Sequence, residues 1–228
     1  SSVMGNDLTA VGAPEYASAG RFGGAVYLNG SAYFTRSVFP SGVPTGSSAY
    51  TIALWAKDNG SAISGGFAGW GNNSGGQCNN FRYSGNNALN NYWWGNDWVL
   101  GSLSANPKDG QWHHLAVTWN GLTQTMYVDG GPVGSATRTG LNAQPANFFV
   151  GKTTGDQPLK GWMDNLLIAN RALDAEEIAG LAADDRLDEL LPVGALLTVD
   201  TGALLELGGS SETLAGLGGG GRVMNGTS

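Results

Sequence analysis

The chain has 228 residues, a formal net charge of −7 and a pI near 4.6. Nucleic acid and anionic membrane surfaces are therefore poor partners, because they repel negative charge. Only 13% of the residues are charged and 38 are glycine, yet 41% are hydrophobic, which suffices for a folded core. The sequence contains no apolar run long enough to insert in a membrane.

Residues 1–172 carry short runs of alternating apolar and polar residues, which predict β-strands. Turn residues separate the runs, and Asn29-Gly30 between two of them is a hairpin signal. Strands at this density are typical of a two-sheet sandwich. The runs lie at residues 25–28, 32–35, 51–57, 88–100, 147–152 and 161–170.

The clearest hairpin spans residues 111–130, QWHHLAVTWNGLTQTMYVDG. Leu115 and Val117 fall on one face of the first run, and Met126 and Val128 fall on one face of the second. Asn120-Gly121 forms a polar break between the runs. Hairpins join neighbouring strands without crossover helices, so we expect an all-β, antiparallel sandwich.

Two C-terminal segments differ from this pattern. In residues 173–191, Asp174 followed by Glu177 resembles a capping box, and apolar residues recur at helical spacing, so a short closing helix or linker is expected. Residues 192–228 are rich in glycine, with alternation at 196–199 and 203–207. They predict either a β-solenoid-like fragment or a glycine-rich tail.

Four motifs, in order, resemble laminin-G-like jelly-roll domains of the concanavalin A-like lectin and glucanase superfamily. They are GRFGGAVYLNG from residue 20, YTIALWA from 50, WHHLAVTWNG with YVDG from 112, and GWMDNLLIANRAL from 161. The resemblance covers roughly residues 5–185 and implies a jelly-roll sandwich. It does not define a function, because this fold carries lectins, adhesion domains and glycanases.

The tail resembles a different family. The words GALLELGG and TLAGLGGGG within residues 192–228 are similar to the β-strand repeat of autotransporter passenger domains. One such unit cannot bury its own apolar face, so further domains of the parent chain are expected. The likeness implies a bacterial protein that is secreted or held at the cell surface.

Catalysis is not expected. Glycosidases need a pair of carboxylates across the scissile bond, and glucanases of this superfamily carry theirs on one strand. The six glutamates include no such pair in a strand-like context. His113 and His114 fall within the hairpin motif and are interpreted as scaffold residues, and Cys78 has no neighbouring histidine in the sequence.

The resemblance also implies a structural calcium ion. Members of the superfamily often hold one between the N-terminal loop, the first glycine-rich bend and the closing strand. Asp164 matches the closing-strand position, and Asn6 and Asp7 are candidates from the N-terminal loop. Calcium favours carboxylate, amide and carbonyl oxygens, which these residues supply.

The candidate ligand site is the aromatic segment NNYWWGNDW, residues 90–98. Flat rings interleaved with amides and a carboxylate suit a sugar, because a ring packs on its C–H face while polar groups bond its hydroxyls. Some of these rings also belong to the core. The ligand residues predicted on this basis are Tyr92, Trp93, Trp94, Asn96, Asp97, Trp98 and Trp70.

The sequence thus favours a non-catalytic carbohydrate-binding module of a larger secreted or cell-surface protein, with a glycan or polysaccharide as partner. A protein–protein adhesion or spacer domain is the alternative, and a glycanase is the least favoured reading. Burial of all the aromatic rings at residues 92–98 would favour the spacer.

Overall fold

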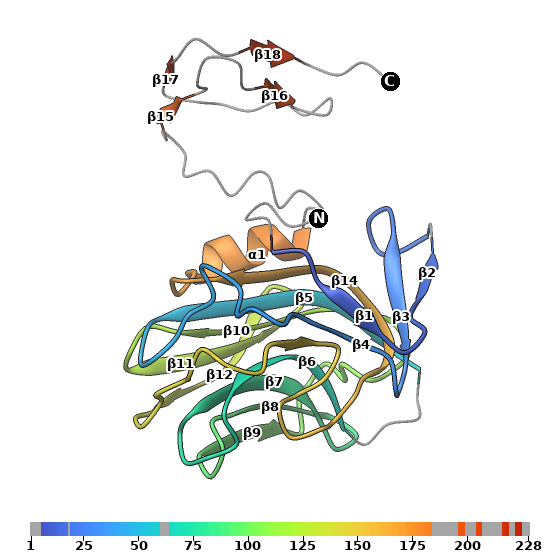
Figure 1. Ribbon diagram of the computed structural model, residues 1–228. Coiled ribbons are helices and arrows are strands. Elements are labelled where there is room, and N and C mark those ends of the chain that lie inside the picture. Colours follow the sequence, from blue (N-terminus) through green and yellow to red (C-terminus); the bar gives the residue numbers. More distant parts are fainter. Residues whose placement is uncertain are drawn as a thin grey trace. The chain divides into compact units, whose positions relative to one another are not determined.

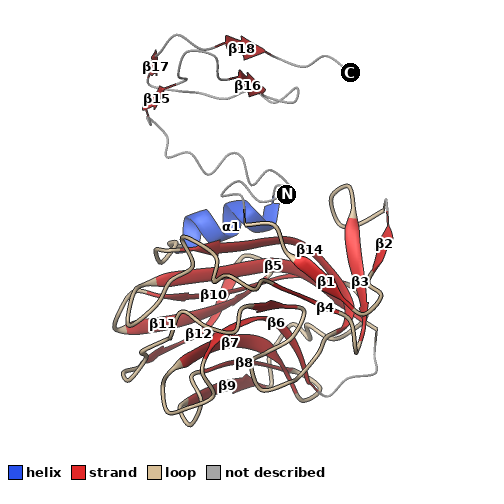
Figure 2. Ribbon diagram, in the orientation of Figure 1, coloured by secondary structure: helices blue, strands red, loops and turns tan. Residues whose placement is uncertain are grey.

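The computed structural model describes residues 6–17, 19–59 and 64–183, and beyond them only the backbone of four short strands. The chain divides into two units, Ser1–Asp185 and Arg186–Ser228. In the described part of the first unit, two antiparallel sheets of seven strands face each other (Figure 1). The predicted all-β sandwich is confirmed, and a single short helix accompanies it in Figure 2 among the described residues.

The first sheet carries the aromatic segment and has the order β1-β4-β13-β6-β7-β8-β9. Its strands are β1 (Thr9–Val11), β4 (Tyr33–Thr35), β13 (Phe149–Val150), β6 (Ser64–Gly71), β7 (Cys78–Ser84), β8 (Ala88–Tyr92) and β9 (Asp97–Gly101).

The second sheet carries the predicted hairpin and has the order β12-β11-β10-β5-β14-β3-β2. Its strands are β12 (Gly131–Thr137), β11 (Thr123–Val128), β10 (Trp112–Trp119), β5 (Tyr50–Asp58), β14 (Lys160–Ala169), β3 (Ala25–Asn29) and β2 (Glu15–Ala17).

The hairpin β10–β11 has the register that its alternation predicts. Leu115 pairs with Val128 and Val117 with Met126, and all four side chains are buried in the core. On its other edge β10 pairs with β5 over its whole length. Because the side-chain period of a strand is two, this register directs one complete apolar face of each strand toward the first sheet.

The core fills the space between the two sheets. Leu54 and Leu115 of the second sheet and Phe67, Trp70 and Phe81 of the first have no exposed surface. Burying one such side chain contributes roughly 1.5–3 kcal/mol to folding. The inner residues of β7 and β8 are therefore fixed by packing, while their alternate residues point away from the core.

Helix α1 (Ala175–Ala183) closes the first unit against β10 and β12. The predicted capping box is present: the Glu177 amide donates to Asp174 Oδ1 at 2.9 Å, and the Asp174 amide donates to Glu177 Oε2 at 2.9 Å. Ile178 and Leu181 are buried on the packed face. The rest of the predicted helical segment, residues 184–191, lies outside the described residues.

In the second unit, four short strands form two parallel pairs. They are β15 (Leu196–Thr198) with β17 (Gly216–Gly218), and β16 (Leu204–Glu206) with β18 (Arg222–Met224). The remainder of the predicted segment 192–228 lies outside the described residues, so the autotransporter-like repeat stays a prediction. No helix among the described residues is long and apolar enough to cross a membrane.

Candidate functional site

Strand β8 sends alternate residues to the two sides of the first sheet. Leu89 and Asn91 point inward, where Leu89 is part of the core and Asn91 bonds to Tyr50 of the second sheet. Asn90 and Tyr92 therefore point outward. The outer side of this sheet near β7, β8 and β9 is called the outer face below.

Two of the predicted ligand residues lie in the core. Trp70 and Trp93 have no exposed surface. Trp70 Nε1 donates to the Pro44 carbonyl at 2.8 Å, and Trp93 packs edge-on against Trp119 with ring centroids 5.3 Å apart. Their rings fill the space between the sheets, so they are unavailable to a ligand at the surface.

Trp94 has the opposite environment. Its side chain is 40% exposed, and its backbone is left-handed, with φ +50°. Positive φ is unusual for a bulky residue and costs about 1–3 kcal/mol. The turn is closed by a bond from the Trp93 amide to the Asn96 carbonyl at 3.1 Å, and the Gly76 amide donates to the Trp93 carbonyl at 2.7 Å. The fold thus holds Trp94 outward at a conformational cost.

Asn96, another predicted ligand residue, anchors this turn. Its Nδ2 donates to the Thr139 carbonyl at 2.7 Å, and its Oδ1 accepts from Arg138 at 3.1 Å. The guanidinium of Arg138 also lies over the Trp93 ring, 3.8 Å from its centroid. Both polar atoms of Asn96 are therefore already used in holding the turn that carries Trp94.

The remaining predicted ligand residues divide between the two sides of the sheet. Asp97 is exposed and pairs with Tyr92 across β8 and β9, so the two share the outer face. Trp98 is partly buried and packs on the core. The structure therefore brings Tyr92, Trp94 and Asp97 together at one end of the outer face.

Arg82 and Asn90 extend this surface along β7 and β8, where they stand directly opposite each other. The Arg82 guanidinium lies 5.4 Å from the centroid of the Tyr92 ring. Burial lowers the pKa of Arg82 from its usual value because it disfavours the charged form. Arg82 Nε, Asn90 Nδ2 and Asn90 Oδ1 are all buried, and they have no hydrogen-bond partner among the described residues.

A loop distant in sequence, residues 152–157, borders the same surface. The Thr154 amide donates to Asn80 Oδ1 at 2.7 Å, which fixes the loop to β7. A Cβ at Gly155 would lie 2.8 Å from the Tyr92 hydroxyl and 3.5 Å from the Trp94 ring. The Gly155 backbone therefore packs against the Tyr92 hydroxyl and the Trp94 ring, where a larger residue would clash. No local pattern in the sequence connects this loop to β8, so it was missed.

The predicted calcium ligand Asn6 has polar contacts within the N-terminal part of the sandwich. Asn6 Oδ1 accepts a bond from the Arg36 guanidinium, and Asn6 Nδ2 donates to the Ser41 carbonyl at 2.8 Å. A cation at this oxygen would compete with Arg36. Asp7 follows Asn6 and is exposed. The amide oxygen expected from the N-terminal loop is thus already engaged.

Asp164 has a defined structural contact of its own. It is 7% exposed on β14, and its Oδ2 accepts the Phe22 amide at 3.0 Å, which fixes the glycine-rich bend. Among the described residues, no group of three His, Cys, Asp or Glu side chains could hold a metal. Calcium stays a prediction that rests on Asp164.

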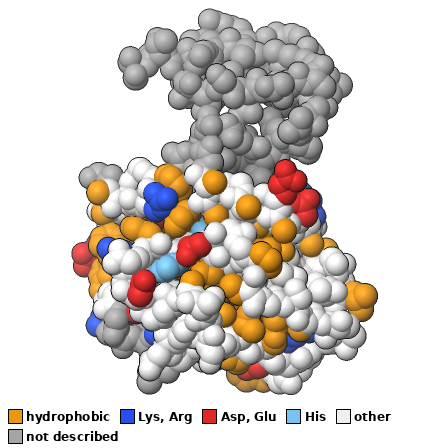
Figure 3. Space-filling model, turned by 180° about the vertical axis from the view of Figure 1, so that it is seen from behind, with side chains coloured by type: hydrophobic (Ala, Val, Ile, Leu, Met, Phe, Trp, Pro, Cys, Tyr) orange, Lys and Arg blue, Asp and Glu red, His pale blue; other side chains and the backbone are white. Residues whose placement is uncertain are grey.

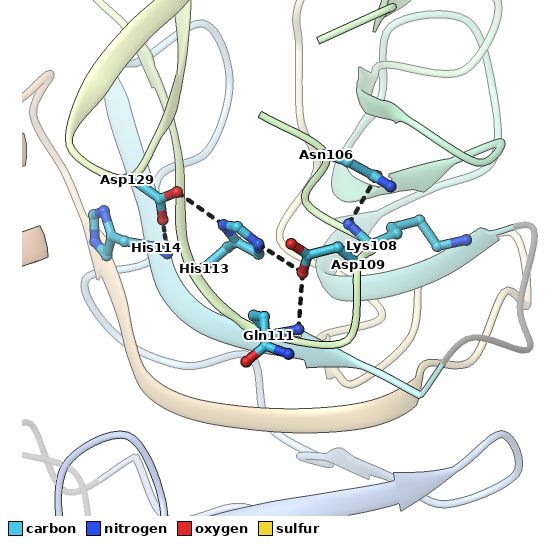
Figure 4. Close-up of polar contacts among 7 residues, drawn as sticks. All are labelled: Asn106, Lys108, Asp109, Gln111, His113, His114 and Asp129. Atoms are coloured by element: carbon cyan, nitrogen blue, oxygen red, sulfur yellow. Dashed lines mark hydrogen bonds and ion pairs between the residues drawn. The ribbon is translucent and has the colours of Figure 1, made fainter. Parts of the chain in front are cut away.

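The two histidines lie at the start of β10 (Figure 4). His113 Nδ1 lies 2.8 Å from Asp129 Oδ2, and His113 Nε2 lies 3.0 Å from Asp109 Oδ1. The His114 amide donates to Asp129 Oδ1 at 3.0 Å, while its ring packs on Trp55 at 5.6 Å. Figure 3 shows histidine beside acidic side chains on the face turned away from Figure 1.

Their environments shift the two imidazole pKa values in opposite directions. Burial disfavours the His113 imidazolium, but Asp129 and Asp109 together outweigh burial and raise the pKa of His113. Burial lowers the pKa of His114 to about 4. Both rings join the scaffold: His113 clamps the loop before β10 to the turn after β11, as the sequence interpretation expects.

The fold and the outer face define a β-sandwich of the lectin type with a small aromatic surface. The chain belongs to the concanavalin A-like lectin/glucanases superfamily, because that family's model matches residues 28–179. The predicted superfamily is confirmed. No curated protein matches the chain.

Solved structures share this fold at low identity. Domain 4 of AbnA, an extracellular arabinanase from Geobacillus stearothermophilus solved with arabinotriose, has a TM-score of 0.61 and 24% identity, over 77% of this chain and 87% of that one. The botulinum neurotoxin serotype G binding domain has a TM-score of 0.58 and 16% identity, over 79% of this chain and 47% of that one. A pentraxin from Limulus polyphemus has a TM-score of 0.51 and 15% identity, over 69% and 81%.

Proposed function

We propose that the first unit is a non-catalytic glycan-binding module of a larger secreted or cell-surface protein, and that it binds through Trp94 on the outer face, where Tyr92, only 5% exposed, lies beneath the surface. The observation that carries the proposal is the conformation of Trp94. The fold accepts positive φ at a large exposed aromatic residue and pins the turn with bonds from Gly76 and Arg138. Strain of this kind is concentrated at functional sites.

The surroundings of Trp94 support a sugar as the ligand. Its exposed ring offers a flat apolar surface, and Arg82 and Asp97 supply polar groups on the same face. The Gly155 backbone packs against the Trp94 ring and the Tyr92 hydroxyl and so helps to fix their positions. A small apolar wall with a few placed polar groups is the usual composition of a ligand site.

The absence of catalysis is part of the proposal and rests on the positions of the glutamates. Glu177 caps helix α1 and pairs with Arg171 at 2.6 Å, and Glu176 lies in the same helical turn. Glu15 lies on β2 at the edge of the second sheet. None of these three glutamates therefore lies beside Asp97 on the outer face.

The test is binding of the 228-residue protein to a glycan array, followed by titration calorimetry with the glycans that bind. Arabinotriose is included because the AbnA domain was solved with it. We expect Trp94→Ala to weaken binding at least about tenfold, as for an aromatic residue at the centre of a contact. Gly155→Val should weaken it similarly, because its Cβ would lie 2.8 Å from the Tyr92 hydroxyl and 3.5 Å from Trp94 and so displace the rings.

Tyr16→Ala is the matched control. Tyr16 is 72% exposed, but it lies on β2 of the second sheet, so its removal should leave glycan binding unchanged. Binding of no glycan by the wild-type protein would overturn the proposal and favour the adhesion or spacer domain. Equal losses in Trp94→Ala and Tyr16→Ala would move the site away from the outer face.

A further inference from the structure

We infer that the glycan recognised by the outer face carries a carboxylate, as a uronic acid does, and that Arg82 binds this group. The inference rests on the proposed function and adds the chemical class of the ligand. It is carried by Arg82 Nε and by both amide atoms of Asn90, which are buried beside the aromatic site and have no partner among the described residues.

Arg82 differs from Arg171 and Arg138 in its polar contacts. Arg171 forms an ion pair with Glu177, and Arg138 donates to side-chain and backbone oxygens in the sandwich interior. Among the described residues Arg82 has no ion pair, and its Nη1 donates a long bond of 3.5 Å to the Tyr83 carbonyl. A half-buried guanidinium without an anion has lost hydration, and the contact with the Tyr92 ring offsets only part of that loss.

Asn90 supplies the second observation. It has no exposed surface, and neither its amide nitrogen nor its amide oxygen has a partner. Leaving such a group unsatisfied costs about 1–3 kcal/mol per atom. Since Asn90 stands opposite Arg82 across β7 and β8, a ligand that draws the guanidinium outward would expose the amide beside it.

The chemistry of this pair matches an acidic sugar. A carboxylate accepts from the planar guanidinium through two parallel bonds, and the Nε that lacks a partner is one of those donors. The Asn90 oxygen can then accept from a neighbouring hydroxyl. A sugar acid presents both groups on one ring, and the Trp94 ring lies close by across Tyr92 and Gly155.

The other charge on this face gives the carboxylate an orientation. Asp97 is exposed on β9 opposite Tyr92, and its charge acts on the pKa of Arg82 without an ion pair forming between them. It repels a carboxylate at its own end of the face and leaves Arg82 as the favourable position. Salt screens the long-range repulsion between the net charge of −7 and an acidic ligand more than it screens a direct contact. The contact between Arg82 and the carboxylate therefore decides whether acidic or neutral glycans are preferred.

The experiment compares matched ligands by calorimetry with the 228-residue protein. The probes are trigalacturonate, trimannuronate and a glucuronate-containing trisaccharide, each with its methyl ester, which keeps the ring and removes the charge. We expect at least one acid to bind at least about tenfold more tightly than its ester, as expected for a charge-assisted bidentate contact. The difference should fall as salt is raised.

Arg82→Gln should bring the ratio of acid to ester affinity close to one, because it removes the charge that distinguishes the acid from its ester. Arg82→Lys should restore part of the preference. Arg21→Gln is the control, because Arg21 is an exposed arginine stacked on Trp55 of the second sheet. Thermal melts of all variants establish that each is folded.

The two proposals fail in different ways. If neutral glycans bind as tightly as acids and Arg82→Gln has no effect, the carboxylate is refuted and glycan binding stands. If acids are preferred and Arg82→Gln keeps the preference, the assignment to Arg82 is wrong. If no glycan binds at all, the proposed function falls and this inference falls with it.

Discussion

Strand β8 builds two different environments from the same kinds of residue. On the inner side, Asn91 and Trp93 lie beside Arg138, whose guanidinium is 3.8 Å from the Trp93 ring. On the outer side, Asn90 and Tyr92 lie beside Arg82, at 5.4 Å from the Tyr92 ring. Each side is an asparagine, an aromatic ring and an arginine.

The difference lies in the hydrogen bonds. Asn91 accepts from Tyr50 and donates to Asn79 at 2.9 Å, and Arg138 donates to the Asn91 carbonyl at 3.1 Å. The outer amide of Asn90 has no partner. The inner set therefore stabilises the fold and holds the Trp94 turn, while the outer set leaves its bonding capacity for something outside the chain.

The largest expected effect comes from removing the inner arginine. Arg138→Met should lower the free energy of unfolding by about 3 kcal/mol or more, because it leaves the oxygens of Gln124 and Asn96 buried without a donor. Arg82→Met, the matched change on the outer face, should change it by less than about 0.5 kcal/mol. Urea unfolding measures both, and equal losses would contradict the distinction between the two sides.

His113 and His114 also have contrasting environments, which shift their pKa values in opposite directions. The pH dependence of the free energy of unfolding should distinguish them. The folded-state pKa of His114, about 4, lies below the usual 6.5, so the unfolded chain binds the proton more readily. His114 therefore favours folding fully above pH 6.5, and about 3 kcal/mol is lost as pH falls toward 4. In His114→Phe, the free energy of unfolding should depend less on pH between 4 and 6.5 than it does in the wild type.

His113 has the opposite sign. Its folded-state pKa is raised, so the paired imidazolium stabilises the fold below the unfolded value and that stabilisation is lost as pH rises through the folded value. His113→Gln should remove the loss on the alkaline side. The Gln111 amide and His113 together lower the pKa of Asp109, so the variant should also alter the pH dependence below the usual 3.8 of that carboxyl. The lowered pKa of Glu177 acts below its usual 4.5 and should not change.

Strand periodicity explains how much of this could be predicted from the sequence. Alternation placed Leu115 and Val117 in the core, and this is confirmed. The 90–98 segment was predicted as a ligand site from its density of aromatic rings, and that site stays a prediction. Alternation could not decide which of Trp93 and Trp94 points outward, because the turn at Trp94 departs from the strand period through its positive φ. The partners of that segment, Arg138 and Gly155, lie more than forty residues away, and no local pattern connects them.

A smaller effect is expected at Asp164, where a buried carboxylate accepts from a backbone amide of a bend. Asp164→Ala should cost about 2 kcal/mol because the Phe22 amide loses its acceptor, and Asp164→Asn about half of that. We expect the loss to be the same in EDTA, since the bond is direct. A melting temperature that rises with calcium in the wild type, but not in Asp164→Ala, would instead establish a calcium site.

The smallest effect tests the strained turn itself. Trp94→Gly and Trp94→Ala remove the same ring and should abolish glycan binding equally, yet the glycine variant should be more stable by about 1 kcal/mol because only glycine adopts positive φ without strain. Val99, 51% exposed on β9, gives the control: there the alanine variant should be the more stable, because glycine weakens an ordinary strand. If alanine is also better at position 94, the turn stores no strain, and the argument from its conformation to ligand binding loses its basis.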